Sequence, residues 1–195
     1  MPEIAGIILV GGQSRRMGRD KATLKWGGAT LAEHLVARLA RRCAPIIVVA
    51  APGQALPITG ARIVEDPIAH QGPLRGLATG LAAASPAEWA FACAIDMPGI
   101  EASLIDELAR HIAVSHDIIT AHDGASAQPL AALYRTALAP SMEAALADGQ
   151  RSPRRFLASA RTCEVLATGL EHQLRNLNTP EEYRAALDED IPAGD

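Results

Sequence analysis

A short apolar run at residues 4–10 (IAGIILV) stands near the start of the chain and narrows the possible folds more than any other feature. The run shows no alternation of polar and apolar residues, so it does not look like a strand with one face in water. Continuous apolar runs are typical of parallel strands buried on both faces. Helices must then cover both faces of the sheet, so this segment favours a layered α/β fold.

The rest of the chain alternates between strand-like and helix-like segments. Helix starts are indicated by a capping box at Thr30 and Glu33, by Pro73 after Gly72, and by residues 179–182 (TPEE). Further strands are predicted at 46–51, 62–65, 89–95, 117–121 and 129–134, and further helices around 104–112, 138–148 and 153–160. This order predicts an α/β domain with a mainly parallel central sheet. We expect a single domain over residues 1–195, frayed from about residue 188.

Composition excludes several classes of function. The formal net charge is −4 and charged residues make up 21% of the chain, so we expect no nucleic-acid binding and only a local phosphate site. No stretch of about 20 apolar residues exists, so we expect no membrane span. The widely spaced Cys43, Cys93 and Cys163 fit neither a disulfide framework nor a CxxC metal site. We therefore expect a cytoplasmic protein.

A glycine-rich and basic loop follows residues 4–10 directly. Gly11 and Gly12 let the backbone approach a ligand and offer amide donors to a phosphate. Four cations follow within seven residues: Arg15, Arg16, Arg19 and Lys21. The loop is not a P-loop, because Gly12 and Gly18 are separated by five residues and an arginine follows, and it lacks the GxGxxG dinucleotide motif. A solvated basic loop is the alternative, but the position after a buried strand favours phosphate binding.

Two carboxylates follow predicted strands, at the edge where parallel sheets bind ligands. Asp96 comes directly after 89–95 and is a candidate ligand for Mg²⁺, which usually takes one or two protein carboxylates beside nucleotide phosphates. The alternative is an N-cap for the next helix, for which Glu101 and Ser103 are better placed. Asp66 follows 62–65 and is a second candidate ligand contact, or else it caps the turn it forms with Pro67.

Four segments carry a resemblance to one family. Residues 9–21 (LVGGQSRRMGRDK) are similar to L-A-G-G-x-x-x-R-M-G-x-D-K, with Val10 in place of Ala, and residues 72–76 (GPLRG) to G-P-L-A-G, with Arg75 in place of a small residue. Residues 96–98 (DMP) are similar to D-x-P, and residues 176–182 (NLNTPEE) to N-x-N-T-P-E-[DE]. Taken in order, the segments cover nearly the whole chain. They resemble the molybdenum cofactor guanylyltransferase family, which implies a Rossmann-like nucleotidyltransferase fold.

The resemblance implies an Mg²⁺-dependent enzyme that transfers GMP from GTP to the phosphate of molybdopterin and releases pyrophosphate. The residues expected to bind GTP are Leu9, Val10, Gly11, Gly12, Lys21, Asp66 and Asp96. Asp96 would hold Mg²⁺, and Arg16 and Lys21 would neutralise the phosphates. Asn176 and Asn178 would close the active site, although turn-forming asparagines are the alternative. Other proteins of molybdenum cofactor synthesis, or acceptor proteins, are candidate partners.

Three other functions stay open. A molybdopterin cytidylyltransferase shares the fold, but that family shows L-A-A-G at the loop, whereas Gly11 leaves room for a purine. A sugar-phosphate nucleotidyltransferase resembles the glycine loop but not residues 176–182. A non-catalytic nucleotide sensor is the third alternative, and the presence of both Lys21 and Asp96 argues against it.

Two details of the substrate contacts also stay open. The family's nucleotide-contacting Asn aligns with Val49, so that contact is lost or is made by backbone groups. The segments at 128–129 and 149–155 match regions that face the pterin in the family. Arg151, Arg154 and Arg155 would hold an acceptor phosphate there, or they form a solvated helix start.

Overall fold

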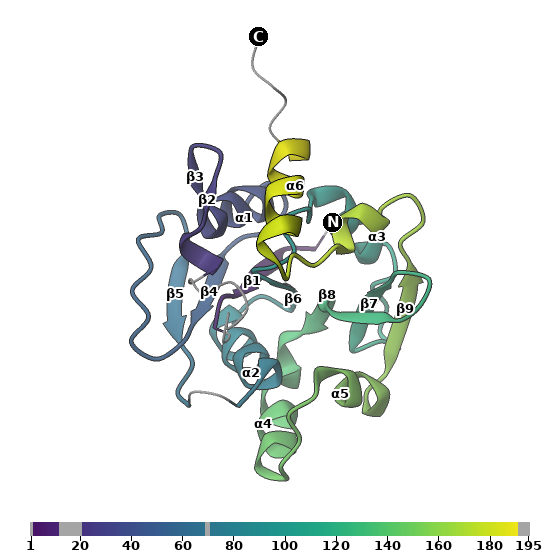
Figure 1. Cartoon of the computed structure of the whole chain (residues 1–195). Coiled ribbons are helices and arrows are strands. Elements are labelled where there is room, and N and C mark those ends of the chain that lie inside the picture. Colours follow the sequence, from purple (N-terminus) through teal and green to yellow (C-terminus); the bar gives the residue numbers. More distant parts are fainter. Residues whose placement is uncertain (1, 12–20, 69–70, 191–195) are drawn as a thin grey trace.

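A computed structural model describes residues 2–11, 21–68 and 71–190, and in these residues a mixed sheet of seven strands forms the middle layer (Figure 1). The strand order is β5-β4-β1-β6-β8-β7-β9. The strands are β1 (Ile4–Leu9), β4 (Ile46–Ala50), β5 (Arg62–Glu65), β6 (Trp89–Ala94), β7 (Ile118–His122), β8 (Ala127–Arg135) and β9 (Thr162–Leu166). Within this sheet β8 runs antiparallel to both of its neighbours, and the other pairings are parallel. The mainly parallel α/β architecture is confirmed.

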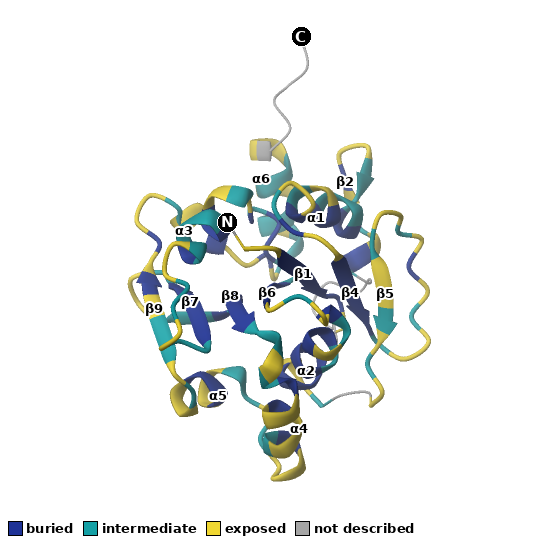
Figure 2. Ribbon diagram, turned by 180° about the vertical axis from the view of Figure 1, so that it is seen from behind, coloured by how far each residue is buried: buried dark blue, intermediate teal, exposed yellow. Residues whose placement is uncertain are grey.

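The first strand explains why helices cover both faces of the sheet. Ile4 and Ile8 of β1 pack into one hydrophobic cluster, and Ile7 and Leu9 pack into the other. Both faces of β1 are therefore buried, as the dark blue strands at the centre of Figure 2 show. The apolar run behaves as predicted, because neither face of the strand meets water.

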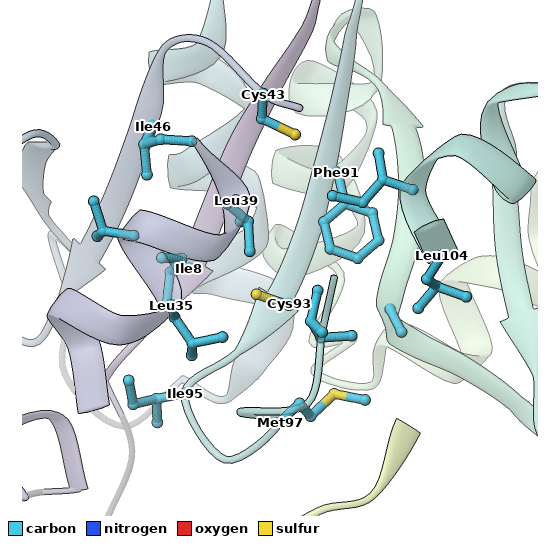
Figure 3. Packing of buried hydrophobic residues seen from close by; sticks show 14 of the residues in the cluster. Ile8, Leu35, Leu39, Cys43, Ile46, Phe91, Cys93, Ile95, Met97 and Leu104 are labelled. Atoms are coloured by element: carbon cyan, nitrogen blue, oxygen red, sulfur yellow. The ribbon is translucent and has the colours of Figure 1, made fainter. Parts of the chain in front are cut away.

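The described helices form two outer layers. One face of the sheet carries α1 (Leu31–Leu39), α3 (Ala102–Ala109) and α6 (Pro180–Asp190); the other carries α2 (Pro73–Ala84), α4 (Ala139–Ala147) and α5 (Pro153–Ser159). On the first face, Leu35 and Leu39 of α1 pack toward Ile8 of β1 and Cys93 of β6 (Figure 3). No helix in the described part of the chain is long and apolar enough to cross a membrane.

The helix starts agree with the predicted caps. The Thr30 hydroxyl accepts a hydrogen bond from the Glu33 N–H, and the Glu33 carboxylate accepts one from the Thr30 N–H, which completes a capping box. Helix α2 begins at Pro73 after Gly72, whose φ of 79° favours glycine. In both cases the first turn begins where the sequence places a residue suited to that backbone position.

Several elements differ from the sequence-based expectation. Beyond the glycine-rich and basic loop that the sequence predicts, the chain forms the 3-10 helix η1 (Lys21–Thr23) and a hairpin of β2 (Lys25–Trp26) and β3 (Ala29–Thr30), neither of which was predicted. The edge strand β9, a 3-10 helix η2 (Thr136–Leu138) and a 3-10 helix η3 (Glu171–Leu174) were not predicted. Each is either very short or, like β9, has only one buried residue, so no run of apolar residues indicates it. Helix α3 ends at Ala109, and helix α6 continues to Asp190.

Candidate functional site

The candidate site lies at the edge where β1, β4, β5 and β6 end, which we call the carboxyl edge. Backbone hydrogen bonds hold the end of β1 between its neighbours: the Ile95 N–H donates to the Leu9 carbonyl at 3.0 Å, and the Val10 N–H donates to the Val49 carbonyl at 3.0 Å. The parallel register thereby brings Asp66, which follows β5, and Asp96, which follows β6, to the same edge. The predicted site residues Gly12 and Arg16 lie outside the described residues.

Lys21 joins this edge to the C-terminal part of the chain. Its Nζ donates to the Leu177 carbonyl at 2.7 Å and lies 3.4 Å from Asp96 Oδ2 and 3.5 Å from Asn178 Oδ1. The Leu177 N–H in turn donates to the Asp96 carbonyl at 2.8 Å. Three segments that are far apart in the sequence therefore meet around one ammonium group, whose side chain is 12% exposed.

The segment that carries Leu177 is itself held firmly. Thr179 and Glu182 form a capping box at the start of α6, and the Glu182 carboxylate also accepts from the Asn178 N–H at 2.7 Å. Tyr183 of α6 packs edge-on against Trp26 of the β2–β3 hairpin, with ring centroids 5.5 Å apart. Asn178 thus reaches the candidate site, whereas Asn176 lies two residues earlier with an exposed side chain.

Asp96 does not cap the helix that follows it. The N-cap residue of α3 is Glu101, whose carboxylate forms an ion pair with Arg38 and whose N–H donates to Gln173 Oε1 at 2.9 Å. The Asp96 side chain, 24% exposed, instead points its Oδ2 toward Lys21. The carboxylate is therefore available at the carboxyl edge for chemistry rather than for helix capping.

The oxygen atoms around Lys21 suit a hard cation. The Asp96 carboxylate, the Leu177 carbonyl and the Asn178 amide oxygen converge on one ammonium group. Mg²⁺ takes oxygen ligands and usually binds one or two protein carboxylates when phosphates and water complete its shell. The described residues hold no cluster of three or more His, Cys, Asp or Glu side chains of the kind that binds a metal without a substrate. The donor set fits an ion that arrives with a nucleotide.

Asp66 forms the turn that the sequence offered as one of its two roles. Its N–H donates to the Ala50 carbonyl at 2.8 Å, and its Oδ1 accepts from the Ile68 N–H at 3.3 Å. Burial raises the pKa of the Asp66 carboxyl, while the Ile68 hydrogen bond and the positive charge of Arg75 act in the opposite direction. A half-buried carboxylate thus lies beside the end of β4, the neighbour of β1, where it can accept a hydrogen bond from a ligand.

Gly11 and Val49 are both constrained by close packing. A Cβ atom on Gly11 would lie 3.3 Å from the Ala51 nitrogen, so a side chain there meets the backbone after β4. Val49 is 2% exposed and packs against α2, where a Cβ atom on Gly80 would lie 3.2 Å from Val49 Cγ2. The Val49 side chain is thus part of the core, and its main-chain carbonyl already accepts from Val10.

A second polar group lies at the carboxyl edge, where β7 ends, β8 begins and α5 starts. Asp123 Oδ1 accepts from the Ala125 and Ser126 N–H groups, which lower its pKa, and Asp123 Oδ2 accepts from Gln128 Nε2 at 2.6 Å. Arg154 Nη2 donates to Ser126 Oγ at 3.0 Å. Gln128 and Arg154 were singled out from the sequence, whereas Asp123 and Ser126 in the β7–β8 hairpin were not.

Arg151 has a different role from Arg154. Its Nη1 donates to the Leu146 carbonyl at 2.6 Å at the end of α4, so it closes that helix end.

The Leu177 carbonyl is a site contact that the sequence could not indicate, because a main-chain group has no residue-type signature. Its only signal is its place between Asn176 and Asn178.

Comparisons with known proteins identify the family of the chain. The family model of the MobA-like NTP transferase domain matches residues 6–165. A probable molybdenum cofactor guanylyltransferase of Mycobacterium avium is 46% identical over 189 residues, covering 94% of each chain. A protein of the same description from Mycobacterium ulcerans is 40% identical over 189 residues, covering 94% of this chain and 93% of its own.

Solved structures show the same fold at low sequence identity. Molybdopterin-guanine dinucleotide biosynthesis protein A from Archaeoglobus fulgidus superposes with a TM-score of 0.78 at 20% identity, covering 96% of this chain and 98% of its own. The 2-C-methyl-D-erythritol 4-phosphate cytidylyltransferase of Thermus thermophilus superposes with a TM-score of 0.73 at 18% identity, with the same coverage. The fold is thus the Rossmann-like fold of nucleotidyltransferases. Because the family model spans most of the chain and the relatives match it nearly end to end, the chain belongs to the MobA-like NTP transferase family.

Proposed function

We propose that this protein is a molybdenum cofactor guanylyltransferase, which transfers GMP from GTP to the phosphate of molybdopterin and releases pyrophosphate. The names of its curated relatives support this function, and both align along 94% of the chain. The observation that carries the proposal is the meeting of Lys21, Asp96 and Asn178 at the carboxyl edge. A phosphate-neutralising cation and a carboxylate suited to Mg²⁺ lie next to each other there.

The backbone at the end of β1 is the proposed nucleotide cradle. Leu9, Val10, Gly11 and Gly12 would offer main-chain groups to GTP, and the absence of a side chain at Gly11 lets the ligand approach closely. Asp66 would accept a hydrogen bond from an N–H or O–H group of the nucleoside. The end of β1 is held between β4 and β6, so the main chain at Leu9 and Val10 is fixed before the ligand arrives.

Charge neutralisation is the main catalytic task. The attacking phosphate of molybdopterin is already anionic near neutral pH, so it needs positioning and charge compensation more than a general base. Lys21 and Arg16 would neutralise the nucleotide phosphates, and Asp96 would hold Mg²⁺, with Asn178 offering a further oxygen. When bound, Mg²⁺ supplies positive charge that stabilises the phosphate oxygens as the bond to pyrophosphate breaks.

The pterin substrate would bind next to this cradle. Gln128, Ser126 and Arg154 form a polar cluster at the same edge of the sheet. An arginine offers planar paired donors to phosphate, so Arg154 is the candidate among the three arginines of 149–155. Arg151 is less suitable, because its Nη1 already donates to carbonyls at the end of α4.

The experiment that tests the function is release of pyrophosphate with molybdopterin and each of GTP, CTP, ATP and UTP. We expect the highest kcat/KM with GTP, because Gly11 leaves room for a purine. Preference for CTP would reassign the protein to cytidylyl transfer. Turnover with a sugar phosphate instead of molybdopterin would favour the sugar nucleotidyltransferases, and nucleotide binding without turnover would make it a sensor.

We place this activity in the cytoplasm and expect contacts with other proteins of molybdenum cofactor synthesis or with acceptor proteins. Cys43, Cys93 and Cys163 are free thiols, as is usual where the surroundings are reducing. Burial raises the pKa of Cys43 to about 12 and also raises that of Cys93, so both stay protonated and unreactive.

A further inference from the structure

Three aromatic rings meet where helix α6 lies near helix α1 and the β2–β3 hairpin (Figure 1). The centroid of the Trp26 ring is 5.5 Å from that of Tyr183 and 5.2 Å from that of His34. Trp26 ends β2, His34 belongs to α1 and Tyr183 belongs to α6, so the rings come from three elements. We call these three residues the aromatic cluster.

The contact between Trp26 and Tyr183 joins the same two stretches of chain that meet at Lys21. Lys21 begins the 3-10 helix that leads to Trp26, and Leu177 comes shortly before the start of the helix that carries Tyr183. Lys21 Nζ donates to the Leu177 carbonyl at 2.7 Å. One hydrogen bond lets two stretches of chain turn about it. A second contact farther along both of them fixes their relative orientation.

His34 extends the connection to the third stretch of chain at the site. Its Nε2 lies 3.2 Å from the Pro98 carbonyl, in the turn that follows Asp96. The Asp96 carbonyl accepts a hydrogen bond from the Leu177 N–H at 2.8 Å. The stretches that carry Lys21, Asp96 and Leu177 are therefore connected twice, once through polar atoms and once through the aromatic cluster.

Tyr183 contributes its ring to the aromatic cluster, and its hydroxyl adds no bond. The hydroxyl oxygen is buried and has no hydrogen-bond partner among the described residues. Burying a hydroxyl without a partner costs free energy, so the hydroxyl does not explain why α6 docks where it does. Edge-to-face packing depends on the relative placement of two rings, so the contact with Trp26 favours one position of α6.

We propose that Tyr183 is a positioning residue for nucleotide binding: by packing against Trp26 it fixes the Leu177 carbonyl, which in turn holds the Lys21 ammonium where a nucleotide phosphate can reach it. The long side chain of a lysine has many conformations, so its ammonium keeps one place only while its acceptors keep theirs. The inference rests on the proposed function, which makes Lys21 a phosphate-binding residue. Tyr183 acts through Leu177 and Lys21 and does not itself bind the nucleotide.

Three variants of α6 separate this role from simple docking of the helix. Tyr183→Leu removes the ring, and Tyr183→Phe keeps the ring and removes the hydroxyl. Leu187→Ala is the matched control, because Leu187 packs against the same hydrophobic cluster from the next turn of α6. If α6 only has to be docked, Tyr183→Leu and Leu187→Ala should have equal effects. The proposed role predicts an effect of Tyr183→Leu alone, with wild-type behaviour in Tyr183→Phe.

The first measurement is hydrogen exchange of the Leu177 N–H in the nucleotide-free protein. This N–H donates to the Asp96 carbonyl, so its exchange rate reports how often the segment opens away from Asp96. We expect exchange to be several-fold faster in Tyr183→Leu and unchanged in Tyr183→Phe and Leu187→Ala. Thermal unfolding should show that every variant is folded. If Tyr183→Leu is not, Tyr183→Met takes its place, because methionine adapts its shape to a gap.

The second measurement is the Kd of GTP by calorimetry in a double-mutant cycle with Lys21→Ala. In the wild-type background, Tyr183→Leu should raise the Kd by roughly 3- to 10-fold, the size expected for an aromatic pair. In the Lys21→Ala background the same change should raise it by less than about twofold, because the ammonium that Tyr183 places is then missing. A role in stability alone predicts no such dependence on Lys21.

Each outcome supports the proposal or overturns it. Equal effects of Tyr183→Leu and Leu187→Ala would overturn it, as would the same increase in Kd with and without Lys21, or an unchanged exchange rate of the Leu177 N–H in Tyr183→Leu. Exchange needs no nucleotide, and the cycle can be measured with CTP if the wild type prefers it. A preference for CTP would therefore refute guanylyl transfer, while the role of Tyr183 would still be decided by its own variants.

Discussion

The two edges of the sheet use the same types of charged residue in different ways. At the edge where β6 and β7 begin, which we call the amino edge, Arg161 donates to both oxygens of Asp117 at 2.6 and 2.8 Å. At the carboxyl edge, Lys21 makes one short bond, to the Leu177 carbonyl, and lies at 3.4 Å from Asp96. One edge has short, paired, directional contacts, and the other has longer contacts shared among several oxygens.

Arg135 is a second arginine at the amino edge that makes several contacts. It pairs with Glu88, donates to the His116 carbonyl at 3.0 Å and to the Ala113 carbonyl at 3.2 Å, and lies 4.5 Å from the centroid of the Trp89 ring. A guanidinium whose donors are already used has little left for a ligand. An ammonium with long contacts can exchange them for phosphate oxygens at small cost, because three rotatable N–H donors adapt to new acceptors. The comparison indicates that charged groups whose hydrogen-bond donors are all used stabilise the fold, whereas charged groups with longer, shared contacts can bind a ligand.

Replacing one aspartate at each edge tests this contrast most strongly. Asp96→Asn keeps the shape of the side chain but removes the charge proposed to hold Mg²⁺, so we expect kcat/KM to fall by about 100-fold or more. Asp117→Asn, the matched change at the amino edge, should leave kcat/KM within about twofold. Pyrophosphate release measures the first effect, and thermal unfolding should show that Asp96→Asn is still folded.

A magnesium titration of the same Asp96→Asn variant sharpens the test. Loss of a metal ligand should raise the Mg²⁺ concentration needed for half-maximal activity before it changes the choice among nucleotides. Near-normal turnover at the Mg²⁺ concentration that suffices for the wild type would remove Asp96 from the mechanism. The carboxyl edge would then not differ from the amino edge in its chemical role.

The next largest effect is expected at the ammonium itself. Lys21→Ala removes a charge-assisted contact to phosphate, which is worth about 1.5–3 kcal/mol. We therefore expect kcat/KM to fall by roughly 10- to 100-fold. Lys25→Ala, four residues away on the exposed side of β2, is the matched control and should have little effect. If the two variants behave alike, the basic loop is a solvated surface and not a phosphate site.

The smallest effect should appear in the stability of the amino edge. Hydrogen bonds from Arg161 hold the pKa of the Asp117 carboxyl below its usual value. A lowered folded-state pKa means that the stabilisation is present above the unfolded pKa of about 3.9 and is lost as the pH falls through the folded value. Asp117→Asn should therefore lower the free energy of unfolding by about 1 kcal/mol or less near neutral pH.

Denaturant unfolding at several pH values checks the sign of this effect. The difference between the wild type and Asp117→Asn should shrink as the pH falls below about 4, because the wild-type carboxyl then becomes neutral too. A difference that grows toward acid would mean that the pair with Arg161 does not stabilise the ionised form, and the charged groups of the amino edge would not stabilise the fold as described above.

The sequence predicted structural elements best where neighbouring residues determine them. The apolar run at 4–10, the capping box at Thr30 and the helix start at Pro73 all have local causes, and each is confirmed. Strand β9 was missed because only one of its five residues is buried at this edge of the sheet, so apolar burial leaves no pattern. The two-residue strands β2 and β3 are too short for any periodicity to appear.

The candidate site likewise has features that the sequence predicts and contacts that it does not. Asp66 and Asp96 could be placed at one edge from sequence, because the carboxyl ends of parallel strands share an edge. The contact of Lys21 with the Leu177 carbonyl could not, since it depends on how the chain returns to the sheet after β9. The contact of Tyr183 with Trp26 was equally hidden, because it joins a helix and a hairpin whose relative position follows from the packed core.

The distance along the chain between Lys21 and Leu177 has a consequence for biosynthesis. The two residues are 156 positions apart, and a ribosome adds about 5–20 residues per second. Most of the sheet can therefore form while the acceptor of the lysine is still to be translated. A contact this remote in sequence closes late in folding, because its loop entropy must be offset by structure that has already formed. A nascent or prematurely terminated chain that lacks 176–182 would thus have the nucleotide cradle without the groups that complete it, and turnover would begin only once synthesis has passed that segment.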